Sequence, residues 1–198
     1  MKVLLILYPI KHYVNVLIGK KESPEIKRKI ATFYQRLIEK RYLDFQRVFV
    51  LFSETKNSTK PNRPQLWEGV SLRNNDIVGA CGITFKNHRE NKLYPEQSNI
   101  LALCPKPIDQ LIVGGFHLWD CVDKIAKYAY QQGLNVLVDE DLTELFFYRV
   151  RNSKGDPFLQ TPISREKSLK QTRKILSKTG LLENARKIRN ERPWLVQI

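Results

Sequence analysis

Four short, predominantly apolar segments constrain the fold of this chain more than any other feature. They are residues Val3–Tyr8, Arg47–Phe52, Leu111–Val113 and Val136–Val138. A strand that is apolar on both faces is typical of a parallel sheet, because helices cover both faces of such a sheet. The sequence therefore predicts an α/β fold, with a doubly wound, mostly parallel sheet and helices on both faces.

The clearest helical patterns lie between these predicted strands. Residues 23–41 begin with Ser23 as an N-cap and Pro24 at the first helical position, and residues 121–132 end just before Gly133. Weaker patterns predict, in chain order, a strand at 77–78, a strand at 82–85, a short helix at 97–103 and a basic amphipathic helix at 164–179.

The length and the charge distribution bear on domains and partners. A chain of 198 residues suits one domain, so we expect an α/β domain over residues 1–183 and a C-terminal arm over residues 184–198. The net charge is +14, and residues 149–198 hold 13 Lys and Arg against 4 Asp and Glu. Such a surface either binds a polyanion such as nucleic acid or is simply a solvated helix face.

The sequence contains no sign of a membrane span. No apolar run approaches the roughly 20 residues that a spanning helix needs. The apolar N-terminal stretch ends at Pro9 without a small-residue cleavage site, so we interpret it as a strand and expect a cytoplasmic protein. Cys81 and Cys104 form no CxxC motif and are expected to be small hydrophobic residues.

The sequence also predicts neither a metal site nor a cofactor. The histidines His12, His88 and His117 are isolated from one another and from any motif with metal-ligand spacing. The acidic run Asp139–Asp141 follows a predicted strand, where we expect it to organise the loop.

Cys121 has the setting of a nucleophile. The strand that begins at Leu111 ends at Gly114 and Gly115, and a short loop then leads to Cys121 at the predicted start of a helix. The positive end of a helix dipole favours a thiolate, and free backbone N–H groups there can bind an oxyanion. The alternative is a buried cysteine without a chemical role.

The stretch from residue 111 to residue 143 resembles the isochorismatase-like cysteine hydrolase superfamily, which includes nicotinamidases and other amidases. The resemblance rests on an apolar strand, then Gly115, five residues and Cys121-Val122. The small residues Ala126 and Ala129 and the later Gly133, Val136 and Asp141 also match the family pattern.

The resemblance implies a Cys-Lys-Asp triad, in which the cysteine attacks the substrate and the aspartate moves the proton. Cys121 matches the nucleophile, and Lys86, or alternatively Lys92, is the candidate lysine. The position of the aspartate, after the first strand, is Tyr8. Tyrosine ionises near pH 10 and is a poor base at neutral pH, so the chain departs from the family here.

Two groups in the loop before Cys121, His117 and Asp120, could take the place of the missing aspartate as base. The resemblance also implies a binding site for a small molecule near the cysteine. The residues expected in it are Gly115, Phe116, Val122 and Trp119, the last either stacking on a planar ligand or sealing the sheet edge.

Three functional hypotheses follow. The first is a cysteine hydrolase that cleaves a small amide or a related C–N substrate through Cys121. The second is a catalytically inactive member of the fold that acts as a binding protein, with the basic C-terminal surface for nucleic acid or another polyanion. The third is a phosphate site at the Gly-Gly loop and the following helix. The resemblance further implies a homo-oligomer.

Overall fold

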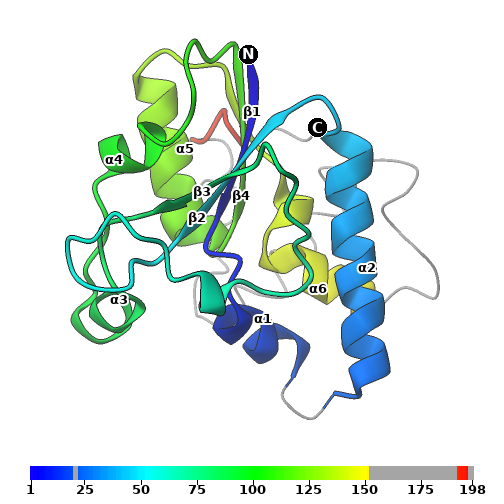
Figure 1. Cartoon of the computed structure of the whole chain (residues 1–198). Coiled ribbons are helices and arrows are strands. Elements are labelled where there is room, and N and C mark those ends of the chain that lie inside the picture. The colour runs from blue at the N-terminus through cyan, green and yellow to red at the C-terminus, as the bar shows by residue number, and fades with distance from the viewer. Residues whose placement is uncertain (20–21, 152–190, 196–198) are drawn as a thin grey trace.

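The core of the molecule is a five-stranded parallel sheet. The computed structural model describes residues 1–19, 22–151 and 191–195. The strands are β1 (Lys2–Leu7), β2 (Gln46–Leu51), β3 (Ile77–Ala80), β4 (Gln110–Gly115) and β5 (Val136–Val138). Their order is β3-β2-β1-β4-β5, and all neighbours are parallel (Figure 1). The predicted fold class is confirmed, because all four apolar segments form strands of this sheet.

Six α-helices in the described part of the chain surround the sheet. They are α1 (Lys11–Ile18), α2 (Pro24–Arg41), α3 (Phe85–Asn91), α4 (Gln97–Leu101), α5 (Asp123–Gln131) and α6 (Glu144–Arg151). Two short 3-10 helices, η1 (Arg63–Gln65) and η3 (Glu140–Leu142), and a π-helical turn, η2 (Leu118–Val122), complete the elements.

Each face of the sheet has its own hydrophobic core. Side chains alternate between the faces of a strand, so Leu5 and Leu7 of β1 point to one core and Leu4 and Ile6 point to the other. The first core contains side chains of α4 and α5, and the second contains side chains of α1, α2 and α6. Figure 1 shows these two groups of helices on opposite sides of the sheet.

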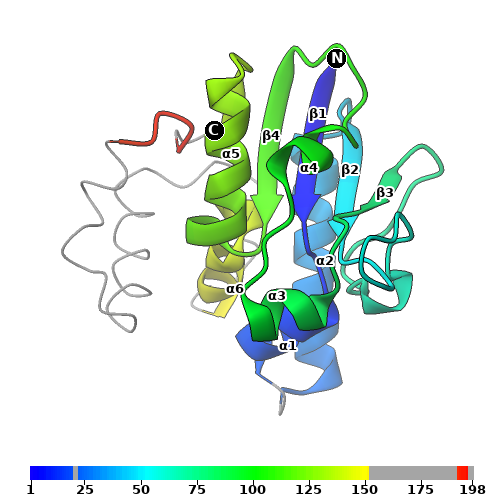
Figure 2. The same ribbon diagram turned by 90° about the vertical axis from the view of Figure 1, so that its left-hand side faces the viewer.

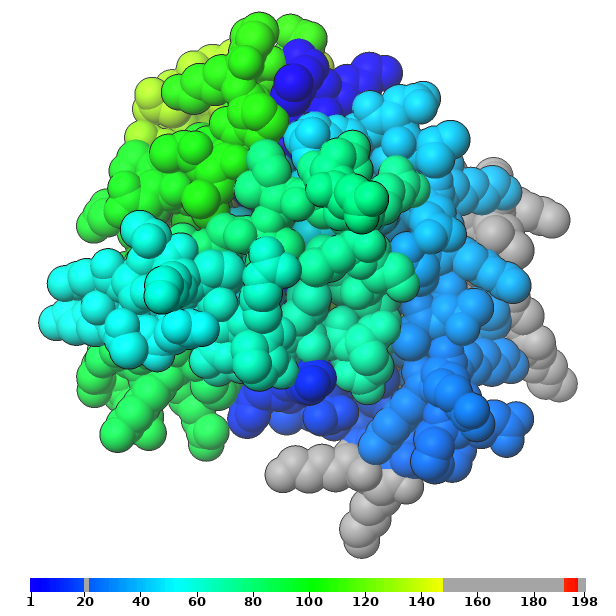
Figure 3. All heavy atoms as spheres, viewed as in Figure 1, coloured from blue at the N-terminus to red at the C-terminus, as the bar shows by residue number. Residues whose placement is uncertain are grey.

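The carboxyl ends of the strands are covered by short elements. Helices α1 and α3 lie at this edge (Figure 2), where the rings of His12 and Phe85 are 4.8 Å apart. The segment that joins β2 to β3 covers the middle of the side of the molecule that faces the viewer in Figure 3. In open parallel sheets this edge is where ligands bind.

One sequence-based expectation about an element is wrong, and three helices were not expected. The strand expected at residues 82–85 is a turn followed by α3: Gly82 has φ +86°, and Thr84 caps the helix through its Oγ1, which accepts from the Asn87 N–H at 3.1 Å. The helices that were not expected are α1, α3 and α6. By contrast, the cap of α2 is as predicted, since the Ser23 hydroxyl accepts from the Ile26 N–H at 3.3 Å.

Residues 191–195 pack on the body of the domain. The Val138 N–H donates to the Trp194 carbonyl at 2.9 Å, and the Trp194 indole donates to Asp123 at 2.8 Å. Arg192 also forms an ion pair with Asp123 at 2.8 Å. The basic helix expected at 164–179 and the boundary expected at residue 183 lie outside the described residues. Among the described residues, no helix is both long enough and apolar enough to cross a membrane.

Candidate functional site

Tyr8 and Cys121 meet at the carboxyl edge of the two central strands. Tyr8 directly follows β1, and the π-helical turn that holds Cys121 follows β4 after a short loop. Strands β1 and β4 are neighbours in register, with Leu7 opposite Gly115. This pairing brings together two side chains that are more than a hundred residues apart in the chain.

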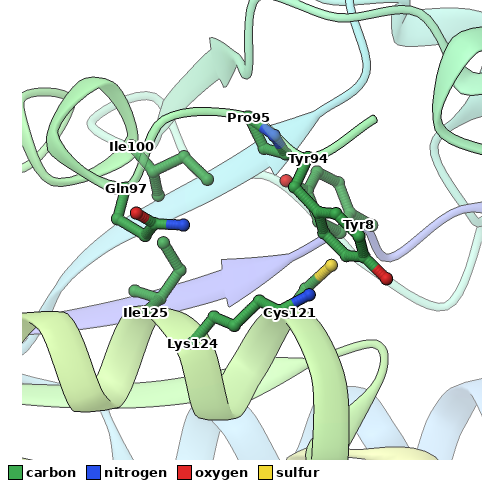
Figure 4. Close-up of a pocket in the computed structure, with 8 residues that line it drawn as sticks. All are labelled: Tyr8, Tyr94, Pro95, Gln97, Ile100, Cys121, Lys124 and Ile125. Atoms are coloured by element: carbon green, nitrogen blue, oxygen red, sulfur yellow. The ribbon is translucent and has the colours of Figure 1, made fainter. Parts of the chain in front are cut away.

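A small pocket lies between these residues (Figure 4). Its lining residues are Tyr8, Tyr94, Pro95, Gln97, Ile100, Cys121, Lys124 and Ile125. The volume of this cavity is about 10 Å³, which is enough for about one water molecule. Figure 4 shows the Cys121 sulfur pointing towards the ring of Tyr8, with Lys124 on the same helix.

Tyr8 is buried and is held firmly in place. Its backbone adopts φ +51°, its N–H donates to the Val50 carbonyl at 2.8 Å, and its ring stacks on Phe52 at 4.4 Å. Its hydroxyl has no partner at hydrogen-bonding geometry among the described residues, although the Cys81 thiol lies beside it. Burial, and then the neighbouring thiols of Cys81 and Cys121, raise the pKa of Tyr8 well above its ordinary value. Tyr8 is therefore neutral at pH 7 and does not replace an aspartate as base.

The Cys121 thiol is neutral in this environment. Its residue is only 5% exposed, and burial raises the pKa of the thiol to about 12. The nearby Asp120 carboxylate raises the pKa further, and Lys124 partly offsets this effect. The expected lowering of the pKa by the helix terminus is outweighed by desolvation, so the nucleophile would need a base to take its proton.

His88 supplies a group of that kind. One ligand-type atom from each of His88, Asp120 and Cys121 lies within 4.8 Å of the other two. The Nδ1 of His88 lies 2.7 Å from the Leu93 carbonyl oxygen. A carbonyl can only accept, so Nδ1 carries the hydrogen and Nε2 of the neutral ring is left as a proton acceptor.

Asp120 and Lys124 form an ion pair at the rim of the pocket. The Lys124 ammonium donates to Asp120 Oδ1 at 2.7 Å, and the Tyr94 hydroxyl donates to Asp120 Oδ2 at 3.0 Å. The ammonium also lies 3.0 Å from the centre of the Tyr94 ring. Burial lowers the pKa of Lys124, but the hydrogen bond and the charge of Asp120 more than compensate, so its pKa is raised and it remains a cation.

The backbone N–H groups before Cys121 are largely occupied. Both carboxylate oxygens of the buried Glu144 accept from the Leu118 N–H, at 3.1 and 2.9 Å. The N–H groups of Asp120 and Val122 each donate to the His117 carbonyl at 3.1 Å. An oxyanion hole made from these three groups, as the helix start suggested, is therefore not open in this structure.

Two of the candidate catalytic residues do not lie in the pocket. The side chain of Lys86 is 79% exposed and pairs with Glu90 at 4.0 Å, and the lysine that lines the pocket is Lys124. His117 faces away towards Glu144, 3.9 Å from its carboxylate, and packs against the ring of Tyr13. Asp120, in contrast, is brought next to Cys121 as expected.

The four expected binding residues form the support of the site rather than the lining of its pocket. Gly115 lies against the backbone of Leu7. Phe116 packs in the core on the α2 face, and Val122 is fully buried in the core that contains Cys121. Trp119 is partly buried against that same core.

The sequence reasoning missed three residues of the site: His88, Tyr94 and Lys124. Lys124 carried a usable signal, because it lies three residues after Cys121 and therefore on the same face of the helix. His88 and Tyr94 belong to α3 and the loop after it, where the sequence had predicted a strand nearby. Cys81 and Cys104 are buried in the core as expected.

The raised pKa of Cys121 predicts slow labelling of its thiol at neutral pH. In a chain with Cys81→Ala and Cys104→Ala, iodoacetamide should react only with Cys121. Because the thiolate is the reactive form and the pKa is about 12, the rate should still rise about tenfold per pH unit between roughly pH 7 and 10. A plateau below about pH 8.5 would show that the thiol is activated and would contradict this result.

Comparisons with known proteins give structural likeness only. No protein-family model matches the chain, and no curated protein matches it.

The structure of the chain is similar to that of an isochorismatase from Pseudomonas putida, with 20% identity over 72% of this chain and 70% of that chain and a TM-score of 0.44. It is also similar to the zinc complex of the pyrazinamidase of Pyrococcus horikoshii, with 16% identity, 78% and 96% coverage and a TM-score of 0.44. The N-carbamoylsarcosine amidase from Thermoplasma acidophilum is similar at 18% identity, 81% and 100% coverage and a TM-score of 0.43. All three are similarities of structure, at sequence identities of 16–20%.

Proposed function

We propose that this protein is a cysteine hydrolase that cleaves a small amide or a related C–N bond, with Cys121 as nucleophile and His88 as base. The observation that carries the proposal is the convergence of Cys121, His88 and Asp120, with their ligand-type atoms within 4.8 Å of one another. A nucleophile needs an adjacent base to take its proton in acyl transfer, and the carboxyl edge of a parallel sheet is where ligands bind in open α/β folds.

The state of each proton fits this assignment. The buried Cys121 thiol keeps its proton at rest, and His88 Nε2 is free to accept it because Nδ1 is held by the Leu93 carbonyl. The thiol is therefore activated only during attack, as a hydroxyl nucleophile is activated by an adjacent imidazole. In this scheme Tyr8 is a neutral wall of the pocket.

The reaction has an acylation stage and a deacylation stage. Cys121 Sγ bonds to the carbonyl carbon while its proton moves to His88 Nε2, and the carbonyl oxygen becomes an oxyanion. The oxyanion collapses, the C–N bond breaks, and the amine leaves with the proton from His88. Water then attacks the thioester, with His88 as base, and releases the acid and the thiol. The Lys124 ammonium is the cation closest at hand to stabilise the oxyanion, since nearby N–H groups are already paired.

The small size of the pocket implies that substrate displaces side chains at its rim. Tyr94 is 40% exposed, and the side chains of Lys124 and Asp120 are 42% and 34% exposed. These three residues contact one another, and Tyr94 and Lys124 line the pocket together with Cys121. Their rotation opens room beside the thiol without moving the sheet.

The test is release of amine or ammonia from a panel of small primary amides and N-carbamoyl amines. We expect turnover by the unmodified chain and loss of about 10³-fold or more in kcat for Cys121→Ser, because the weaker nucleophile cannot replace the thiol. Cys104→Ala is the matched control, since Cys104 is also a buried cysteine but does not line the pocket. Equal turnover by Cys121→Ser would refute the proposal. A folded chain without turnover on the whole panel would favour the alternative of an inactive binding protein.

A further inference from the structure

Three side chains at the rim of the pocket offer one nitrogen, one oxygen and one sulfur to a common point. They are His88 of α3, Asp120 and Cys121 of η2, and their ligand-type atoms lie within 4.8 Å of one another. All three histidines and all three cysteines of the chain lie within the described residues. We propose that His88, Asp120 and Cys121 form a binding site for a single divalent zinc-class cation.

The ligand types fit this class of cation. Imidazole, carboxylate and thiolate are the three groups that bind Zn²⁺ in proteins, and a three-ligand set leaves a fourth position open. The thiolate excludes Mg²⁺ and Ca²⁺ as preferred occupants, because these cations favour oxygen ligands. Here the open position would face the pocket between Tyr8 and Tyr94.

The surroundings of the ligands support the same reading. A metal-bound histidine commonly donates its other ring N–H to a backbone carbonyl, which fixes the tautomer. His88 has that second contact already, with Nδ1 2.7 Å from the Leu93 carbonyl oxygen. Asp120 is likewise oriented by the hydroxyl of Tyr94, at 3.0 Å.

Only small movements are needed to close the site. Ligand atoms around a tetrahedral Zn²⁺ lie about 3.5 Å apart, given metal–ligand bonds of about 2.0–2.3 Å. The present separations are at most 4.8 Å, and His88 and Asp120 are both partly exposed and able to turn. Lys124 must give up its contact with Asp120, and its side chain is 42% exposed, so it can move into solvent.

Bound metal would occupy the Cys121 sulfur. The cation and the proposed nucleophilic role therefore exclude each other, and zinc should inhibit the hydrolase. This consequence rests on the proposed function, whereas binding of the metal itself does not.

Cobalt is the probe for the site, because a Co²⁺–thiolate bond gives a ligand-to-metal charge-transfer absorption. We expect the unmodified full-length chain to bind one Co²⁺ with this absorption, and Zn²⁺ to displace it. Cys121→Ser should abolish the absorption, and His88→Ala should weaken affinity at least about 100-fold. Cys104→Ala and His12→Ala are matched controls that should bind as the unmodified chain does.

Two results would overturn the site: no charge-transfer absorption at excess Co²⁺, or equal binding by Cys121→Ser and His88→Ala. Far-UV circular dichroism without metal checks that each variant is folded, and a misfolded His88→Ala is replaced by His88→Gln. The two proposals fail separately. A chain that turns over amides but binds no Co²⁺ refutes only the metal site, and one that binds Co²⁺ but turns over no amide refutes only the hydrolase.

Discussion

Replacing His88 by glutamine should slow the acylation of Cys121 by about 10²–10⁴-fold, the usual contribution of a general base. Glutamine keeps a polar side chain at this position, but its amide cannot accept the proton of the thiol. The Cys121 pKa of about 12 makes this proton transfer obligatory at neutral pH. The measurement is the burst of p-nitrophenolate from p-nitrophenyl acetate, an activated ester that forms a thioester with a nucleophilic cysteine.

His12→Gln provides the matched control, because His12 is also a histidine at the carboxyl edge of the sheet but does not belong to the cluster around Cys121. Its burst rate should equal that of the unmodified chain. Cys121→Ser defines the background. If His88→Gln acylates as fast as His12→Gln while both remain folded, His88 is not the base and the proposed mechanism is wrong.

The sheet could be predicted from the sequence because its signal is local. Each of the four apolar segments is a strand that is buried on both faces, and each lies within one or two residues of the observed bounds. The remaining strand, β3, lies at the edge of the sheet and has one buried residue, Gly79. Its apolar pattern in the sequence is therefore weaker. The parallel direction of β1, β2, β4 and β5 fits the helices that lie between them in the chain, whereas β2 and β3 are joined by a long segment whose one helical element is η1.

The site could be predicted only in part, because it is assembled by tertiary contacts. Cys121 was recognisable from its spacing after Gly115, and Asp120 and Tyr8 from their neighbours in sequence. A ring nitrogen of His88 lies within 4.8 Å of the Cys121 sulfur, and His88 belongs to α3, which begins after the turn at Gly82. The residues around His88 in the sequence give no signal that it lies near Cys121.

The burial of Cys121 could not be predicted from the sequence either. A thiol at the start of a helix predicts a lowered pKa, but η2 places the residue inside the core, where desolvation dominates. The backbone N–H donors expected to bind an oxyanion are used by the chain itself, since they donate to Glu144 and to the His117 carbonyl. The burial of Cys121 and the pairing of these N–H groups depend on side chains 20 or more residues away in the chain or on the π-helical conformation of η2.

Gly115, which is part of the family pattern in the sequence, is needed for a structural reason. Its φ of +107° is one that residues with a side chain rarely adopt, and an added Cβ would lie 2.1 Å from the Leu7 oxygen and 2.4 Å from the Leu7 nitrogen. These backbone atoms cannot move aside, because β1 is paired on both edges. The close approach of β4 to β1 is what sets Cys121 beside Tyr8.

Gly115→Ala is therefore expected to destabilise the protein by about 2–5 kcal/mol, from about 1–2 kcal/mol for the positive φ and about 1–3 kcal/mol for overpacking. This is a large part of the roughly 5–15 kcal/mol that stabilises a typical domain. The free energy of unfolding in urea measures it, and the burst of p-nitrophenolate from the folded fraction should also fall, because β4 can no longer hold η2 in register with β1.

Gly133→Ala separates the two causes. Gly133 also has a positive φ, +78°, but an added Cβ there would meet no atom within 4 Å. It should lose only the backbone contribution of about 1–2 kcal/mol, and its burst rate should be unchanged. If Gly115→Ala is no more destabilising than Gly133→Ala, then β1 can yield at Leu7, and the contact between the two strands does not fix the position of Cys121. If Gly115→Ala loses several kcal/mol more and also loses the burst, the same backbone contact that stabilises the sheet places the nucleophile.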